Sequence, residues 1–480
     1  MSPALVAVAV PLAFALLAFV VPSERARPRI LPVAALCQLA IVGALLASGS
    51  GVRSPDEWVG LDPLGRLLLG YLAVLFLGCA CYAPAYLRLR SERPNRIFCT
   101  MLLFFFAMMN LFGLAQHVGL MWVAIEATTL STAPLLYFNH NRRSIEATWK
   151  YLLIGSVGIA LALLGSFFLG YASLHAGLAS SLVMGELLPH AGELSRPWLH
   201  AAFVLLLVGY GAKMGLAPMH TWKPDAYGEA PGLVGALLAG GLTSCAFVGV
   251  LRFYGVCVAA GDAEFARELM LGFGLLSMAV GGVFMVRQRD YKRMLAYSSV
   301  EHMGILVLGA AVGGAGLFGA LLHVLNNGFT KAVLFLSAAN IHRHFGSKST
   351  DQVHGALREL PASAALFLVG FLAVTGAPPF GPFLSEFTIL RAAVSDGRLA
   401  LAGAFLALLL LVFVGMGATV LAVVQGEPPA GRERRPGPET FWQVAPIVAL
   451  LLLVLLLGVW LPAPLESALW SAARFVEARP

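Results

Sequence analysis

The sequence has few charged residues for its length. Asp, Glu, Lys and Arg make up only 12% of its 480 residues, whereas 59% of the residues are hydrophobic and the mean hydropathy is +0.82. Soluble globular proteins contain about 25% charged residues, so this composition excludes an ordinary soluble protein. The bilayer is therefore expected to be the solvent around most of the chain.

The sequence also lacks the usual signatures of catalysis and of cofactor binding. It has six cysteines, and none belongs to a CxxC pair that would suit zinc, an iron–sulfur cluster or a redox dithiol. Neither a GxSxG nucleophile motif nor a Walker loop is present. We therefore expect no metal, no cofactor and no structural disulfide in this chain, and no enzymatic activity of the chain alone.

Long apolar runs fill most of the sequence. A spanning helix needs roughly 20 mostly apolar residues, and the sequence offers fourteen such segments. They fall at about 3–21, 30–47, 64–86, 97–115, 118–138, 150–173, 198–219, 231–257, 269–286, 299–314, 317–340, 362–395, 399–424 and 441–461. We expect an all-α polytopic membrane protein with about 14 transmembrane helices, in which residues 1–480 form a single membrane domain.

Basic residues alternate between the loops that join these segments. The odd-numbered loops, counted from the N-terminus, hold 21 of the 32 Lys and Arg residues, and the even-numbered loops are nearly free of them. Because Lys and Arg are retained on the cytoplasmic side, the alternation supports the helix count and places both termini outside the cytoplasm. It also explains the net charge of +7 without a nucleic-acid partner.

Two of the apolar segments contain residues that interrupt helices. These are Gly211, Lys213, Gly215 and Pro218 in the seventh segment, and Gly376, Pro378, Pro379, Gly381 and Pro382, followed by Glu386, in the twelfth. A break at membrane depth survives only where protein or water satisfies the freed backbone groups, so both segments indicate an internal cavity. Matching interrupted helices in two halves of a chain indicate structural repeats and an ion path.

Glu126 and Lys213 are ionisable residues inside apolar segments. A carboxylate near the middle of a span costs several kcal/mol unless it is paired, hydrated or protonated. Lys213 on the interrupted seventh segment is the expected partner of Glu126, and a pair that faces water can load and release a proton. The alternative is a static ion pair that only fixes helix packing.

A polar stripe is predicted on the eleventh segment. His323, Asn327 and Lys331 are spaced four residues apart and share one helix face, with Asn326 beside them. Histidine exchanges protons near neutral pH, so the stripe, continued by Glu386, fits a hydrated proton wire. The alternative is that His323 is a structural core residue.

Two further groups of polar residues are less informative. His220, Lys223, Asp225 and Glu229 lie in HTWKPDAYGEAP, which we expect to be a loop whose side chains order the turn after the seventh span. Glu301 and His302 are expected near the cytoplasmic start of the tenth segment, where a proton can enter. Solvated interfacial charges are the alternative there.

Three stretches of the sequence carry a family resemblance. They are PMHTWKPDAYGEAP followed by GALLAGG, then RQRDYKRMLAYSSVEHMG, and HVLNNGFTKAVLFLSAANIH. Over about residues 60–420 the chain closely resembles the antiporter-like membrane subunits of respiratory complex I (subunits L, M and N), of Mrp-type cation antiporters and of membrane-bound NiFe hydrogenases. AYSSVEHMG and the total length are most similar to the F component of hydrogenase-4.

The resemblance implies an organisation of the chain. Helices 1 to 3 would occupy residues 3–96, and a first five-helix repeat (helices 4 to 8) residues 97–258. An inverted second repeat (helices 9 to 13) would occupy 265–424, and helix 14 with an amphipathic tail 441–480. Helices 7 and 12 would be the broken ones.

The resemblance also implies roles for particular residues. By position, Glu126 matches the fifth-helix glutamate, Lys213 the seventh-helix lysine, Lys331 the eleventh-helix lysine and Glu386 the exit residue of the twelfth helix. Two positions depart from the family pattern. Relatives often carry a lysine on the eighth helix at the place of Ser244, and some carry a histidine where this chain has Asn327.

Three functions use these residues in the same way. The leading hypothesis is a proton-translocating subunit of a respiratory oxidoreductase complex in a bacterial inner membrane, driven by redox chemistry in partner subunits. The others are an Mrp-type cation/proton antiporter module and a proton channel that energises inorganic carbon uptake. A purely structural stator is a fourth possibility.

Overall fold

The computed structural model describes residues 3–48, 58–178, 182–428 and 439–477, and within them every regular element is a helix. The N-terminal half contains α1 (Pro3–Val20), α2 (Arg27–Ala47), α3 (Pro63–Arg88), α4 (Arg96–Leu114), α5 (Val118–Leu136), η1 (Tyr137–Asn139), α6 (Arg142–His175), α7 (Met184–Leu187), η2 (Ala191–Glu193), α8 (Arg196–Met214), α9 (Trp222–Glu229), α10 (Gly232–Leu237), η3 (Leu238–Leu242) and α11 (Thr243–Ala259). The C-terminal half contains α12 (Ala263–Met285), α13 (Tyr291–Val312), α14 (Ala315–Phe345), α15 (Ala356–Glu359), α16 (Pro361–Val374), α17 (Gly381–Ser395), α18 (Leu399–Val424), α19 (Phe441–Val459) and α20 (Ala463–Val476).

The structure confirms an all-α polytopic membrane fold. Among the described residues, eleven helical segments are long and apolar enough to cross a bilayer, and two shorter apolar helices lie at Ala4–Val20 and Pro361–Val374. Helix α14, although 31 residues long, is not among the eleven. The count of fourteen and the division into two five-helix repeats stay predictions.

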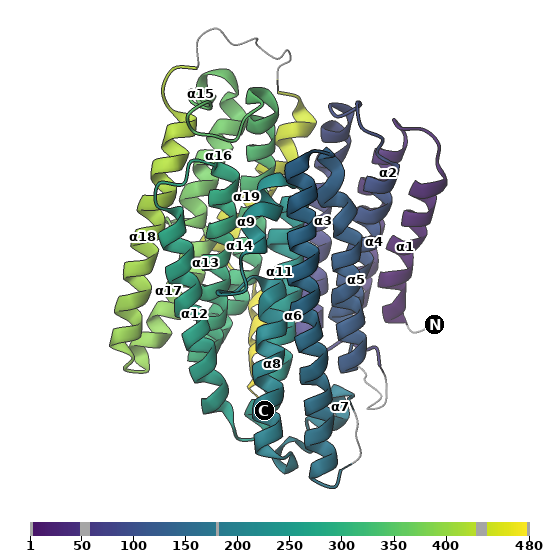
Figure 1. Cartoon of the computed structure of the whole chain (residues 1–480), viewed down its shortest axis with the longest axis vertical. Coiled ribbons are helices and arrows are strands. Elements are labelled where there is room, and N and C mark those ends of the chain that lie inside the picture. Colours follow the sequence, from purple (N-terminus) through teal and green to yellow (C-terminus); the bar gives the residue numbers. More distant parts are fainter. Residues whose placement is uncertain (1–2, 49–57, 179–181, 429–438, 478–480) are drawn as a thin grey trace.

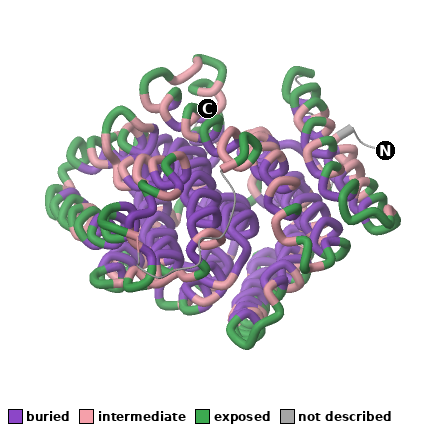
Figure 2. The backbone as a smooth tube through the Cα atoms, turned by 90° about the horizontal axis from the view of Figure 1, so that it is seen from above, coloured by how far each residue is buried: buried purple, intermediate pink, exposed green. Residues whose placement is uncertain are grey.

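The helices run side by side around a buried centre. In Figure 1, α1 to α5 lie on one side of the molecule and α12 and α16 to α18 on the other, with α11 and α14 between them. Figure 2 shows buried residues gathered in the middle and exposed residues around the rim. Helix α14 packs against α10, α13, α16, α17 and α19, and every residue from 316 to 341 is buried. The polar stripe predicted on this helix therefore faces protein.

Both predicted helix breaks are confirmed. Helix α8 ends at Met214, Gly215 follows with φ of 77°, and the chain becomes helical again only at α9. Helix α16 ends at Val374, and α17 begins at Gly381 after Gly376 with φ of 72°. This left-handed backbone favours glycine, which explains both residues. The two breaks lie in the two halves of the chain, next to the polar side chains that the sequence singled out.

The HTWKPDAYGEAP segment is not a loop, and that expectation was wrong. Residues Trp222–Glu229 form α9, with Pro224 in the first turn, where a helix loses no backbone hydrogen bond by lacking an N–H. Helix α9 packs against α6 and α13. Ion pairs of Asp225 with Lys150 (2.8 Å) and of Glu229 with Lys348 (2.6 Å) hold it there. Asp225 and Glu229 thus order this part of the fold, as the sequence suggested.

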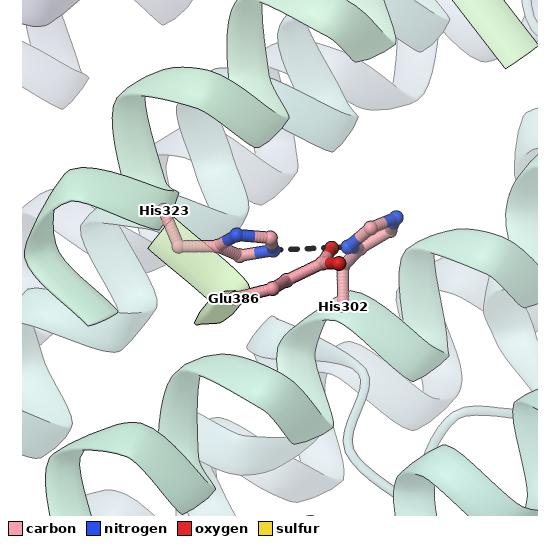
Figure 3. A group of neighbouring side chains, drawn as sticks. All are labelled: His302, His323 and Glu386. Atoms are coloured by element: carbon pink, nitrogen blue, oxygen red, sulfur yellow. Dashed lines mark hydrogen bonds between the residues drawn. The ribbon is translucent and has the colours of Figure 1, made fainter. Parts of the chain in front are cut away.

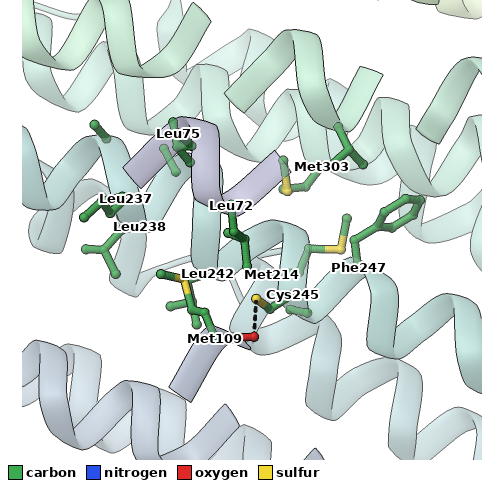
Figure 4. Packing of buried hydrophobic residues seen from close by; sticks show 14 of the residues in the cluster. Leu72, Leu75, Met109, Met214, Leu237, Leu238, Leu242, Cys245, Phe247 and Met303 are labelled. Carbon is green, nitrogen blue, oxygen red and sulfur yellow. Dashed lines mark hydrogen bonds between the residues drawn. The ribbon is translucent and has the colours of Figure 1, made fainter. Parts of the chain in front are cut away.

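Apolar side chains fill the centre around α11. Figure 4 shows Leu72, Met109 and Leu242 close together, and Phe247, Met214 and Met303 belong to the same cluster. These two methionines directly follow Lys213 and His302 in the sequence. The apolar core thus extends to the residues next to Lys213 in the N-terminal half and next to His302 in the C-terminal half.

The C-terminal helix α20 folds back onto the bundle. It packs against α3, α11 and α14, and it buries Leu469, Ala472, Ala473 and Val476 on one face. Trp470 stacks on Phe318 of α14, with ring centroids 4.5 Å apart. The helix has the one-sided apolar pattern that the sequence predicted.

Candidate functional site

Glu126 of α5 and Lys213 of α8 form an ion pair. The Lys213 Nζ donates to Glu126 Oε2 at 3.2 Å and to the hydroxyl of Thr129, one turn along α5. The Lys213 side chain is 1% exposed and that of Glu126 is 19% exposed. The partner expected for Glu126 is thus the one the structure provides. A charge pair in such a site is strengthened by the low dielectric but keeps access to water through the carboxylate.

Helix α6 also contacts this ion pair. The Ser156 hydroxyl donates to Glu126 Oε1 at 3.4 Å, so both carboxylate oxygens have a partner. Tyr151 lies near the lysine, with the Nζ 6.0 Å from its ring centroid. At Gly155 a Cβ would approach Lys213 Nζ to 3.0 Å, so the glycine lets α6 pass close to the ammonium group. These contacts from α5, α6 and α8 define the first polar group.

A second polar group lies around α14. Lys331 is fully buried, and its Nζ donates to the Ser298 hydroxyl of α13 at 2.5 Å. One turn along α13 from Ser298 stands Glu301, which is also fully buried and whose two oxygens accept no hydrogen bond from the described residues. Lys331 and Glu301 are thus two ionisable side chains in the same buried region between α13 and α14.

His302, His323 and Glu386 meet next to Glu301 (Figure 3). Nδ1 of His302 and Nε2 of His323 are 3.0 Å apart, and Nδ1 of His323 is 2.8 Å from the Ser385 hydroxyl of α17. The Glu386 carboxylate reaches the same point from α17, and its Oε1 accepts no hydrogen bond from the described residues. Helices α13, α14 and α17 thus bring two imidazoles and a carboxylate together beside the second break.

The expected location of Glu301 and His302 was wrong. Helix α13 begins at Tyr291, eight residues before the apolar run, because Asp290 accepts hydrogen bonds from the backbone N–H groups of Lys292 and Arg293 and caps the helix. Glu301 and His302 therefore lie in the middle of the helix and are buried. Hydropathy misplaced the start because the polar residues of this helix are covered by protein.

Ser244 and Asn327 differ in what their side chains contact. Ser244 is 3% exposed, and its hydroxyl donates to the Gly240 carbonyl of its own helical segment at 2.5 Å. Asn327 is buried, and its Oδ1 accepts no hydrogen bond from the described residues. A serine whose hydroxyl donates to a backbone carbonyl offers little to a proton path, whereas a free amide oxygen in a buried space is a site for water.

Lys223 is a buried charge that the sequence analysis treated as a turn residue. Its side chain is fully buried, its Nζ donates to the Ser299 carbonyl of α13 at 3.3 Å, and the Tyr227 ring centroid is 5.7 Å away. It packs against the Cα of Gly215 at the break after α8, where a Cβ would clash with it. Lys223 therefore joins the first broken helix to α13, which carries the second polar group.

Arg252 and Asp62 form a second buried ion pair that the sequence did not reveal. Nε and Nη2 of Arg252 lie 3.1 and 3.2 Å from the Asp62 carboxylate, and the guanidinium also donates to the carbonyls of Phe112 and Gly113. Asp62 caps α3, and the two carbonyls belong to the C-terminal end of α4. This pair fastens α11 to two helix ends, which is a structural role.

The site residues thus fall into two groups and one bridging lysine. No hydrogen bond or ion pair between described residues runs directly from the Glu126–Lys213 pair to the cluster on α13, α14 and α17. Lys223 contacts both the break after α8, at Gly215, and the Ser299 carbonyl of α13, the helix that carries Glu301 and His302. A protein that moves charge between the groups needs water, side-chain motion, or both.

Comparisons with known proteins agree with this architecture. Residues 115–412 match the model of the family described as NADH:quinone oxidoreductase/Mrp antiporter, transmembrane. A hydrogenase-4 component F homolog of Methylacidiphilum infernorum is 37% identical over 67% of this chain and 68% of its own length. NADH-quinone oxidoreductase subunit N of Desulforudis audaxviator is 31% identical over 80% of this chain and 77% of its own.

Solved structures show the same fold over nearly the whole chain. A subunit of the Mrp complex from Dietzia sp. DQ12-45-1b superimposes with a TM-score of 0.88 at 22% identity, covering 100% of this chain and 98% of that one. A subunit of respiratory complex I from Thermus thermophilus gives 0.83 at 23% identity, with 99% of each chain covered. The family match and the two relatives decide the assignment: the chain belongs to the NADH:quinone oxidoreductase/Mrp antiporter family of transmembrane subunits.

Proposed function

We propose that this chain is a proton-translocating membrane subunit of a multi-subunit respiratory oxidoreductase complex, of the hydrogenase-4 or complex I kind. The observation that carries the proposal is the placement of ionisable side chains inside the helix bundle near two helix breaks. Buried Lys213 and partly buried Glu126 lie at the first, and buried Lys331, His323 and Glu386 lie at the second. Such residues are costly in a membrane and are retained for ion movement. Membership of a family whose relatives are subunits of such complexes supports it.

The two groups would move protons by charge coupling. While Glu126 is charged, its attraction keeps the proton on Lys213; separation of the pair, or protonation of Glu126, releases that proton. When a positive charge leaves Lys213, the electrostatic field at the next buried lysine of the path changes. The proton would finally pass Lys331, the His302 and His323 imidazoles and Glu386, since imidazole both accepts and donates protons near neutral pH.

Lys223 would supply the central charge that relatives place on the eighth helix. Ser244, which occupies that position, cannot hold a charge, and its hydroxyl donates to a carbonyl. Lys223 instead enters from α9, is fully buried and touches α13. With Lys223 included, a titratable lysine stands at the first pair, at the centre and at the second group.

The redox chemistry would belong to other chains. We propose that this chain binds no electron carrier, is not itself an enzyme and works with membrane and peripheral partner subunits. It would reside in a bacterial inner membrane with both termini outside the cytoplasm, as the alternation of basic loops indicates.

The test is proton uptake by the assembled complex in sealed vesicles, measured together with electron transfer. Glu126→Gln, Lys213→Ala and Lys331→Ala should each reduce proton uptake strongly. The matched control is Glu193→Gln, because Glu193 is a 60% exposed glutamate on η2, outside both groups. Unchanged proton uptake in the three variants would make the chain a structural stator.

An Mrp-type antiporter module is the second candidate. It uses the same residues, and the fold is shared with the Mrp complex. It predicts that a sodium gradient alone drives proton movement through the complex in the absence of electron donor. The oxidoreductase proposal predicts that proton movement stops when electron transfer stops.

A further inference from the structure

The cluster of His302, His323 and Glu386 has the composition of a metal site. Each residue offers one ligand atom, these atoms all lie within 4.8 Å of one another, and all three residues are buried. Figure 3 shows the two imidazole rings end to end with the Glu386 carboxylate beside the gap between them. Two histidines and one carboxylate, with one position left for water, form a common zinc site.

We propose that His302 Nδ1, His323 Nε2 and the Glu386 carboxylate bind a divalent transition metal ion, with zinc as the best match and water as the fourth ligand. The 3.0 Å between the two nitrogens is close to the roughly 3.3 Å that separates two ligands of a tetrahedral zinc ion with bonds of about 2.0 Å. A metal would replace the present histidine–histidine hydrogen bond with little movement of the rings.

The outer contacts of the two histidines support this assignment independently. Histidines that bind metals usually donate their other ring N–H to a carboxylate, carbonyl or hydroxyl, which fixes the tautomer. His323 has the Ser385 hydroxyl 2.8 Å from its Nδ1, and His302 has Glu301 Oε2 3.5 Å from its Nε2. The outer nitrogen of His323 is thus hydrogen-bonded, whereas that of His302 makes no hydrogen bond and has a carboxylate oxygen nearby. When the metal takes Nδ1 of His302, the ring proton sits on Nε2, facing Glu301.

Unpartnered atoms and charge also favour a cation here. Oε1 of Glu386 and both oxygens of Glu301 are buried and accept no hydrogen bond from the described residues. Two carboxylates can balance a doubly charged ion. Lys331 and Lys223 are the cations that oppose it, and Lys331 is turned toward the Ser298 hydroxyl.

The second helix break borders the site. The Glu386 carboxylate lies against Gly376 in the segment between α16 and α17, and a Cβ there would collide with it. Pro378 and Pro379 of the same segment are exposed. Of the three ligand residues, Glu386 is therefore the one in contact with the break segment.

Metal binding is testable without any transport measurement. The purified complex is loaded with zinc sulfate, passed through a desalting column, and analysed for zinc by mass spectrometry and for zinc ligands by X-ray absorption. We expect one zinc per chain, bound by two imidazole nitrogens. His302→Gln, His323→Gln and Glu386→Gln should each weaken binding by at least about tenfold, whereas His200→Gln, at a half-exposed histidine on α8 outside the cluster, should not.

Several results would overturn the site. These are the absence of zinc from the loaded wild-type complex, retention of zinc by all three variants, or zinc coordination without imidazole. If a variant fails to assemble, the X-ray absorption spectrum of the wild-type complex still shows whether two imidazole nitrogens bind the zinc.

The consequence for transport rests on the proposed function and is separable from binding. A metal on both imidazoles removes them from proton exchange, so zinc should slow proton uptake by the wild-type complex. Zinc that binds at these residues without slowing proton uptake would support the metal site and contradict the assignment of the proton path to them.

Discussion

The two polar groups differ in how completely their hydrogen bonds are formed. In the first group both oxygens of Glu126 have partners, and Lys213 contacts both Glu126 and Thr129. In the second group the unpartnered buried atoms include both oxygens of Glu301, Nε2 of His302, Oδ1 of Asn326, Oδ1 of Asn327 and Oε1 of Glu386. Buried polar atoms are nearly always satisfied by protein or by ordered water. The first group is therefore a direct ion pair, whereas the second leaves several buried polar atoms without a protein partner.

The largest effect is expected from Lys213→Ala, which tests whether the first pair carries protons. Removing one partner of a buried pair typically costs about 3–5 kcal/mol and leaves Glu126 without its cation. Proton uptake should fall about a hundredfold or more, equivalent to about 2.7 kcal/mol in a barrier. The double variant Glu126→Gln/Lys213→Met should regain thermal stability but not proton uptake. Recovery of both would mean that the pair only holds helices together.

A smaller effect is expected from Lys223→Met, which tests the link between the groups. Proton uptake should fall about tenfold, because the central charge disappears while both terminal groups remain. Adding Ser244→Lys should restore part of it by placing a lysine where relatives have one. The matched control is Lys292→Met: this lysine is also buried, but its Nζ donates to the Ala230 carbonyl outside both groups. An equal loss in the control would argue against a special role of Lys223.

A severalfold effect is expected from Asn327→Leu, which tests whether water occupies the second group. Leucine branches at the same carbon but is larger and has no oxygen for a water molecule, so proton uptake should fall about two- to fivefold if the water wire is weakened. Asn327→His, which introduces the residue some relatives carry, should preserve or raise it. Wild-type proton uptake by the leucine variant would show that the unpartnered Oδ1 is not on the path.

The smallest effect on transport is expected from Arg252→Met, although its effect on stability is large. Loss of the guanidinium leaves the Asp62 carboxylate and two helix-end carbonyls buried without their donor, at a cost of about 3–5 kcal/mol. The unfolding temperature and the yield of assembled complex should fall. Proton uptake per assembled complex should stay unchanged, which separates this structural pair from Glu126–Lys213.

Much of the fold could be predicted from the sequence because a helix that crosses the bilayer must be long and mostly apolar. Apolar length located eleven helical segments that could cross a bilayer among the described residues, and glycine with proline located the breaks after α8 and α16. The spacing of His323, Asn327 and Lys331 placed them on one face of α14, and the structure has that helix. The local sequence was enough to predict these features because each of them depends on a single helix.

The errors concern residues whose environment is made by distant segments. Lys223 resembles a solvated loop lysine until α9 packs against α13, and Arg252 is hidden in an apolar run whose partner, Asp62, lies 190 residues away. Glu301 and His302 were placed at a helix start because hydropathy does not detect polar residues covered by protein. The cluster with Glu386 needed three helices to be positioned together.

The burial of residues 316–341 of α14 bears on how the protein is inserted into the membrane. A helix entering the membrane alone would expose His323, Lys331 and three asparagines to lipid, and charged residues at the centre of a span disfavour insertion by roughly 3 kcal/mol each. In the finished fold all of them face protein. We therefore expect α14 to leave the insertion machinery together with α13, which supplies Ser298 to Lys331, so that assembly of the proton path and membrane insertion are one event.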